Sequence, residues 1–134
     1  AKEDDRINFR GKYNSEQLAN IYQKIDLLII PSLCYETFSM VLHESLAFNV
    51  PALVSGIGAL AEKIQNGKNG LTFLPGDALD LQRKLEFIAK RPEILLKMKD
   101  FIKNHESVPL VEEEFANYLR FYNKIIEHEA ITPQ

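Results

Sequence analysis

This sequence has few of the features that identify a protein class directly: cysteines, long apolar runs and an excess of charge of one sign. Its 134 residues contain a single cysteine, Cys34, so neither a disulfide framework nor a Cys-x-x-Cys metal site can form within the chain. The longest uninterrupted apolar run, residues 27–30, is far shorter than the roughly 20 residues of a membrane-spanning helix. The net charge is −3 with 26% charged residues, a near balance that does not indicate nucleic-acid binding.

The ends and the composition narrow the class further. The first residues are polar and contain no apolar segment, so we expect no secretory signal peptide. A single cysteine is typical of a reducing compartment. Because the sequence begins with Ala1 rather than methionine, we expect a processed or trimmed chain. A hydrophobic fraction of 46% is sufficient for a folded core, and the length fits one domain.

Apolar spacing predicts alternating strands and helices. Four short apolar segments are expected to be strands: residues 7–9, 26–30, 51–55 and 70–74. Spacings of three and four residues predict helices between them, at residues 15–25, 38–48 and 60–64. Tyr22 lies on the apolar stripe of the first of these helices. After residue 77 only helices are expected, the last from about residue 111 to about residue 129.

This order predicts an α/β fold, a Rossmann-like parallel sheet flanked by helices. Residues 26–30 show no polar alternation, which is typical of a strand covered on both faces. In such sheets ligands bind where the strands end. Chemistry is therefore expected in residues 11–13, 31–39 and 55–59.

Residues 31–44 hold the richest pattern, since they leave a strand, form a loop and enter a helix near Phe38. The first N–H groups of a helix have no partner and carry partial positive charge, which suits a phosphate group. The predicted donors are the N–H groups of Phe38, Ser39, Met40 and Val41. Within the same helix, His43 is expected to pack or face solvent rather than to act as a base.

Two carboxylates flank this predicted anion site. Glu36 precedes the helix, and Glu44 shares the face of Met40 and Val41 with its side chain leaning back toward the loop. Carboxylates accept hydrogen bonds from paired hydroxyls, so ribose and sugar are suitable neighbours. Two glutamates at this spacing, near a helix start, also occur without any ligand role. The spacing alone leaves both interpretations open.

The ensemble of motifs resembles the C-terminal domain of the group 1 (family 4) glycosyltransferases, which have the GT-B fold. The matching segments are Phe9-Arg10-Gly11, Pro31-Ser32, Glu36-Thr37-Phe38-Ser39, Glu44-Ser45-Leu46-Ala47, Pro51-Ala52-Leu53-Val54, Gly58 with Glu62, and Asn69-Gly70-Leu71. The resemblance runs in register over residues 7–89. It implies that the chain is the C-terminal half of a GT-B fold, truncated at its N-terminal side.

The resemblance also implies a division and a function. Residues 1–110 would form part of a nucleotide-sugar-binding domain, and residues 111–134 a C-terminal helix that packs toward the absent N-terminal domain. The chain would be the donor-binding part of a retaining hexosyltransferase-like enzyme of glycan biosynthesis. Such an enzyme moves a sugar from a nucleotide diphosphate sugar to an acceptor such as a glycan or lipid.

Site roles follow from the resemblance residue by residue. Glu36 would be catalytic, holding hydroxyls of the donor sugar close to the reacting carbon. The N–H groups of Phe38, Ser39 and Met40 would contact the sugar or diphosphate, and Val41 would lie near phosphate and ribose. Glu44 would bind the ribose hydroxyls, while Lys12 and Tyr13 would lie near the base. Neither a metal nor a cofactor is expected, since the nucleotide sugar is the substrate.

The sequence departs from the family pattern at two places. Ser39 stands where the family usually has glycine, which would be costly if that position required positive φ. The basic residues that neutralise the diphosphate in the family lie upstream, in a segment that this sequence lacks. The chain by itself is therefore expected to be inactive.

The expected partners are the nucleotide-sugar donor and an acceptor glycan or lipid held by the missing domain, with no nucleic acid. Because nucleotide sugars usually belong to the cytoplasmic pool and no signal peptide is expected, we expect a cytoplasmic protein without a transmembrane segment. The missing domain would allow peripheral contact at the inner face of the membrane. Two alternatives stay open. One is a non-catalytic nucleotide-binding or protein-interaction module, and the other a related GT-B sugar-nucleotide epimerase. The donor sugar, the base and the acceptor are not identified by the sequence.

Overall fold

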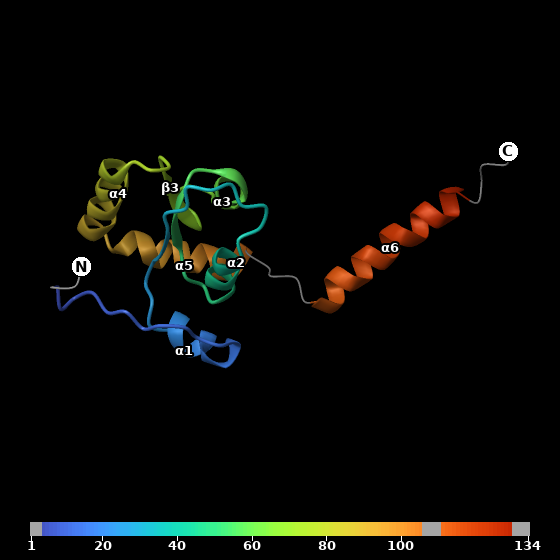
Figure 1. Ribbon diagram of the computed structural model, residues 1–134, viewed down its shortest axis with the longest axis horizontal. Helices are drawn as coiled ribbons and strands as arrows, with labels where there is room; N and C mark the ends of the chain where they lie inside the picture. The colour runs from blue at the N-terminus through green and yellow to red at the C-terminus, as the bar shows by residue number, and fades with distance from the viewer. Residues whose placement is uncertain (1–3, 106–110, 130–134) are drawn as a thin grey trace.

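Figure 1 shows the computed structural model, which describes residues 4–105 and 111–129, with side chains of the last helix described over residues 115–126. The elements in chain order are the 3₁₀ helix η1 (Ser15–Gln17), α1 (Leu18–Tyr22), β1 (Leu28–Ile30), α2 (Met40–Ala47), β2 (Ala52–Ser55), α3 (Gly58–Lys63), β3 (Gly70–Phe73), α4 (Ala78–Lys90), α5 (Glu93–His105) and α6 (Val111–Glu129). The α/β architecture expected from the sequence is confirmed.

The strands form one parallel sheet in the order β1-β2-β3. β2 lies in the centre, with Leu28 to Ile30 paired to Ala52 to Val54 on one side and Gly70 to Phe73 paired to Ala52 to Ser55 on the other. Every residue of β2 is buried. Because the strands are parallel, their carboxyl ends lie along the same edge of the sheet, and the following loops start there.

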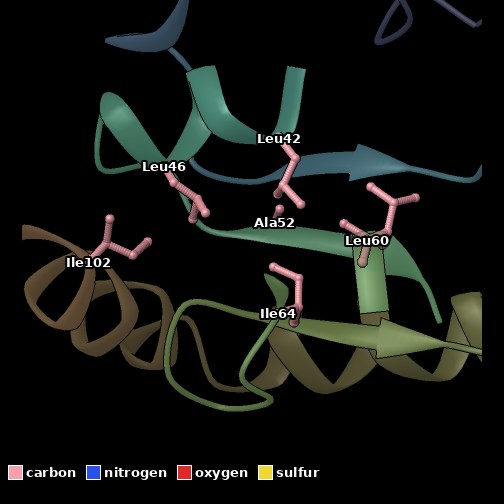
Figure 2. Packing of buried hydrophobic residues seen from close by; sticks show 7 residues of the cluster. Leu42, Leu46, Ala52, Leu60, Ile64 and Ile102 are labelled. Carbon is pink, nitrogen blue, oxygen red and sulfur yellow. The ribbon is translucent and has the colours of Figure 1, made fainter. Parts of the chain in front are cut away.

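Side chains of β2 alternate between two apolar clusters, one on each face of the sheet. Ala52 and Val54 belong to the cluster in Figure 2, in which Leu42 and Leu46 of α2 approach the strand from one side. The other members of this cluster come from α3, the residue after it and α5: Leu60, Ile64 and Ile102. On the opposite face, Leu53 packs with Phe73 of β3 and Ile88 of α4. The sheet is thus covered by α2 and α3 on one face and by α4 on the other.

Two expectations about the first strands are wrong. Residues 7–9 are not a strand, and Ile7 and Phe9 are 47% and 81% exposed. A strand needs neighbours for its N–H and C=O groups, and no described strand pairs with this segment. β1 is not covered on both faces, because Ile29 is 40% exposed on the edge strand of the described sheet. The doubly covered strand is β2.

The last helix carries an exposed apolar face. Its exposed large side chains are Phe115, Tyr118, Leu119, Phe121, Tyr122, Ile125 and Ile126. Figure 1 shows α6 standing apart from the sheet and the other helices. The predicted division at residue 110 lies outside the described residues and stays a prediction.

The turn from α3 into β3 brings two backbones into contact. Asn69 is fully buried, its Oδ1 accepts from the N–H of Gln65 at 2.7 Å, and its Nδ2 donates to the carbonyl of Lys63 at 3.1 Å. These bonds place Gly70 directly beside β2. A Cβ at Gly70 would lie 2.1 Å from the carbonyl oxygen of Ala52, so this position accepts only glycine.

We expect Gly70→Ala to lower the free energy of unfolding by about 3 kcal/mol, because a backbone clash cannot be relieved by a rotamer change. Urea unfolding of this chain measures the effect. Gly56→Ala is the matched control, since a Cβ there would meet only ordinary contacts at 3.4 and 3.7 Å. Equal unfolding midpoints for the two variants would contradict the assigned role of Gly70.

Candidate functional site

The loops that follow β1 and β2 meet at the carboxyl edge of the sheet. The N–H of Ala59, near the start of α3, donates to the carbonyl oxygen of Glu36 at 3.2 Å. Gly58 adopts φ +52°, and a Cβ there would lie 3.1 Å from the same carbonyl oxygen and 3.3 Å from the ring of Tyr35. The loop that carries Glu36 is therefore anchored to the start of α3, so two of the segments in which chemistry was expected, residues 31–39 and 55–59, lie in contact.

α2 begins at Met40, two residues later than the predicted start at Phe38, and Ser39 is its N-cap residue. Ser39 has extended backbone angles, φ −101° and ψ 101°, and its carbonyl accepts the first helical bond from the N–H of His43 at 3.1 Å. The negative φ shows that serine is unstrained at this position, so glycine is not required. The helix-end donors are therefore Met40, Val41 and Leu42, while Phe38 and Ser39 precede the helix.

The N–H groups from Phe38 to Leu42 have no acceptor within the described part of the chain. Ser39 is 6% exposed, whereas Phe38 and Met40 are 61% and 68% exposed. At the start of α2, the side chains of Phe38 and Met40 are therefore exposed, and the N-cap residue Ser39 between them is buried. Unpaired donors at a helix start are the feature that binds anions.

His43 packs against the residues just before the helix. Its ring stacks on Phe38 with centroids 4.0 Å apart, and its Nδ1 lies 2.8 Å from the carbonyl oxygen of Ser39. Since a carbonyl oxygen only accepts, Nδ1 carries the proton and donates. This packing role agrees with the expectation for His43.

Glu44 is half-buried, and its carboxylate is held by a residue that the sequence analysis missed. The hydroxyl of Tyr22 lies 3.2 Å from Oε2 of Glu44 and 3.3 Å from the carbonyl oxygen of Val41. The Tyr22 ring is buried and stacks on Phe48, with centroids 5.2 Å apart and planes 7° from parallel. Burial first, then the charge of Glu44 and the hydrogen bond to it, raise the pKa of Tyr22 above its ordinary value, so the hydroxyl keeps its proton.

One signal in the sequence pointed to this contact. Tyr22 lies on an apolar helical stripe, and a buried tyrosine hydroxyl usually finds a hydrogen-bond partner. The stripe predicts that Tyr22 is buried but does not identify Glu44 as the partner, because the two residues lie on different helices.

The other residues predicted for the site are Glu36, Lys12 and Tyr13. Glu36 is half-buried, and its side chain forms no hydrogen bond or ion pair with any described residue. Lys12 and Tyr13 are exposed in the segment after Gly11, and the Lys12 side chain forms no hydrogen bond or ion pair with a described residue. Tyr13 lies close enough to Tyr22 to contribute to the raised pKa of that hydroxyl. The placement of Lys12 and Tyr13 near the base stays a prediction.

A small apolar cavity of about 180 Å³ lies at the same edge of the sheet, beside the start of α4. Its lining residues are Pro31, Leu33, Phe73, Gly76, Asp77, Ala78 and Leu81. The carboxylate of Asp77 accepts from the N–H groups of Leu79 and Asp80 at 2.9 and 3.0 Å, so it caps α4. This cavity was not predicted from the sequence.

Neither a metal site nor a membrane-spanning helix is found among the described residues. Within residues 4–105 and 111–129, no group of three or more His, Cys, Asp or Glu residues is arranged to hold a metal ion. Over the same ranges, no helix combines the length and the apolar character needed to cross a bilayer.

Comparison with known proteins gives consistent results. Residues 2–107 match the family described as glycosyl transferases group 1. An uncharacterised glycosyltransferase of Methanocaldococcus jannaschii is 36% identical over 70 residues, which are 52% of this chain and 18% of that protein. The chain therefore spans only a small part of this relative.

Two solved structures share the fold. Sucrose-phosphate synthase from Thermosynechococcus elongatus superposes with a TM-score of 0.75 at 23% identity, over 92% of this chain and 31% of that one. The Anabaena protein HepE, solved in complex with UDP, superposes with a TM-score of 0.63 at 19% identity, over 75% of this chain and 29% of that one. In both, the matching region is less than a third of the known chain.

Proposed function

Because the chain belongs to the group 1 glycosyltransferases, we propose that it is the donor-binding part of a larger retaining enzyme. This enzyme would move a sugar from a nucleotide diphosphate sugar to an acceptor such as a glycan or lipid. One observation carries the proposal: the unpaired N–H groups at the start of α2 lie between Glu36 and Glu44 at the carboxyl edge of the parallel sheet. Ligands of open α/β sheets bind at that edge.

The diphosphate is assigned to the start of α2. The N–H groups of Phe38, Ser39, Met40 and Val41 are free to donate, and the helix dipole favours negative charge by about 1 kcal/mol at this end. Donors that are already fixed in place stabilise the charge that develops on a leaving diphosphate without further reorganisation. The proposed mechanism relies on such donors and on positioning, and it requires no metal.

The two carboxylates are assigned to opposite ends of the donor. Glu44 lies within α2, and one of its oxygens, Oε1, has no partner among the described residues, which leaves it free to accept from ribose hydroxyls. Glu36 lies on the anchored loop before the helix and is assigned to the sugar, close to the reacting carbon. The base is assigned to the side of Lys12 and Tyr13. UDP is the first nucleotide to test, because HepE was solved with it.

Neither carboxylate of the proposed site forms an ion pair with a described residue. Ion pairs among the described residues lie elsewhere, for example between Arg6 and Asp4, Lys90 and Glu86, and Lys99 and Asp26. A diphosphate bound beside Glu36 and Glu44 therefore needs positive charge from another part of the enzyme. We assign both that charge and the acceptor-binding surface to the rest of the full-length protein.

Binding and turnover of the full-length enzyme test this function. UDP, GDP and ADP are titrated by calorimetry, followed by the intact sugar donors. A transferase releases free diphosphate when an acceptor is added, whereas an epimerase converts the donor into a nucleotide sugar of changed configuration at one sugar carbon and needs no acceptor. Binding of a diphosphate with neither release from the donor nor epimerisation of the donor would support a non-catalytic nucleotide-binding module instead.

Glu44→Ala should weaken binding of the nucleoside diphosphate by about 1.5–3 kcal/mol, the scale of a hydrogen bond to a charged group. Calorimetry on the full-length enzyme measures it. Glu86→Ala is the control, since Glu86 is an exposed residue of α4. An affinity unchanged by Glu44→Ala would overturn the ribose assignment.

Glu36→Gln should lower turnover far more than it weakens binding of the bare nucleoside diphosphate. A residue that contacts the reacting sugar contributes mainly in the transition state. Steady-state rates with the intact donor and calorimetry with the diphosphate separate the two effects. If binding weakens and turnover stays intact, the roles of Glu36 and Glu44 are reversed.

The 134-residue chain alone should form no product above background when incubated with donors and candidate acceptors. Its proposed site offers only helix-end dipoles to offset the diphosphate charge, each worth about 1 kcal/mol. We expect at best millimolar affinity for the nucleotide, about 4 kcal/mol of binding free energy. Chromatographic assay of the incubated mixtures checks the first point, and steady transfer by the chain alone would show that acceptor binding lies within it.

A further inference from the structure

The Tyr22 hydroxyl connects two helices at the proposed nucleotide site. It extends from the end of α1 to the carboxylate of Glu44 on α2, 22 residues further along the chain. We propose that Tyr22 is a positioning residue, which holds Glu44 in the orientation that accepts the ribose hydroxyls. This inference rests on the proposed function, in which Glu44 binds the ribose.

The hydrogen-bond geometry gives the two carboxylate oxygens of Glu44 different roles. Tyr22 has one hydroxyl proton and two acceptors nearby, Oε2 of Glu44 at 3.2 Å and the carbonyl oxygen of Val41 at 3.3 Å. A bond to an ionised carboxylate is the stronger of the two. Tyr22 therefore occupies Oε2 and leaves Oε1 for a ligand. A glutamate held in this way loses less side-chain freedom when the ribose binds.

The Tyr22 ring is a fixed support for this bond. It is 3% exposed and stacks on Phe48, the residue that caps the C-terminal end of α2. The hydroxyl thus has a defined position relative to both ends of that helix. Glu44 is half-buried by comparison, so its carboxylate lies at the boundary between the core and the site.

The second acceptor matters for ligand exchange. If Glu44 turns away from Tyr22 when no ligand is bound, the hydroxyl can still donate to the carbonyl oxygen of Val41. A buried hydroxyl left without any acceptor would oppose that movement. The Tyr22 hydroxyl therefore keeps an acceptor in either case and can bind Glu44 again when a ligand enters.

Tyr22→Phe tests the inference, because phenylalanine keeps the ring and its stacking on Phe48 and removes only the hydroxyl. In the full-length enzyme, the affinity for the diphosphate that binds best among UDP, GDP and ADP should fall about fivefold, the effect of one ordinary hydrogen bond. The affinity for its 2′,3′-dideoxy form should change less than about twofold, because that ligand offers Glu44 no hydroxyl. Combined with Glu44→Ala, Tyr22→Phe should have no further effect.

Two further measurements separate positioning from general support. In the 134-residue chain, where Tyr118 of α6 is exposed, the unfolding midpoint of Tyr22→Phe is compared with that of Tyr118→Phe. With the intact donor, KM should rise while kcat stays unchanged, as expected for binding lost equally in the ground and transition states.

The outcomes distinguish this inference from the function on which it rests. Equal losses of affinity for the ribose and dideoxy ligands would show that Tyr22 supports the fold generally, and would overturn the positioning role alone. The same holds if Glu44→Ala weakens binding and Tyr22→Phe does not. If Glu44→Ala leaves the affinity unchanged, or if no diphosphate binds the unsubstituted enzyme, the ribose assignment fails and the positioning role fails with it.

Discussion

The structure depends above all on one constraint, the burial of β2 between two parallel neighbours and two apolar layers. Its backbone pairs with β1 and β3, and its side chains alternate between the two clusters. Parallel pairing sends the loops after the strands to the same edge of the sheet. The contact between Glu36 and Ala59 forms at this edge, because the loops after the neighbouring strands β1 and β2 both start there. The candidate site is thus a consequence of how the centre of the sheet is packed.

Much of this architecture could be predicted because local pattern and burial agree. The apolar runs at residues 26–30, 51–55 and 70–74 contain β1, β2 and β3, and the stripe at residues 38–48 contains α2. Prediction failed where a segment depends on a neighbour that its own pattern cannot reveal. Residues 7–9 have the spacing of a strand and lack a described partner, and Ile29 lies on an edge strand rather than a central one.

Some features of the candidate site could likewise be predicted from the sequence, and others could not. The motifs around Glu36 and Glu44 could be recognised, and the start of a helix in that region could be predicted within two residues. The cap at Ser39, the anchoring of Glu36 by Ala59 and the bond from Tyr22 to Glu44 could not. Each of these depends on backbone angles or on contacts between distant segments, and spacing within one segment carries no information about them. The serine at position 39, a departure from the usual glycine, is explained by its extended backbone.

Three residues fix the loop between β1 and α2. Pro31 follows directly after β1, the carbonyl oxygen of Glu36 accepts from the N–H of Ala59 in α3, and Ser39 is the N-cap residue of α2. The bond between Glu36 and Ala59 divides the loop into two stretches, one before and one after Glu36, which differ in whether they tolerate an inserted residue. An extra residue beside exposed Leu33 and Cys34 can bulge into solvent and leave Glu36 in place. Between Glu36 and Ser39 both ends are fixed, so an insertion would move the glutamate relative to the helix. Natural or engineered loop extensions are therefore compatible with this site only on the strand side of Glu36.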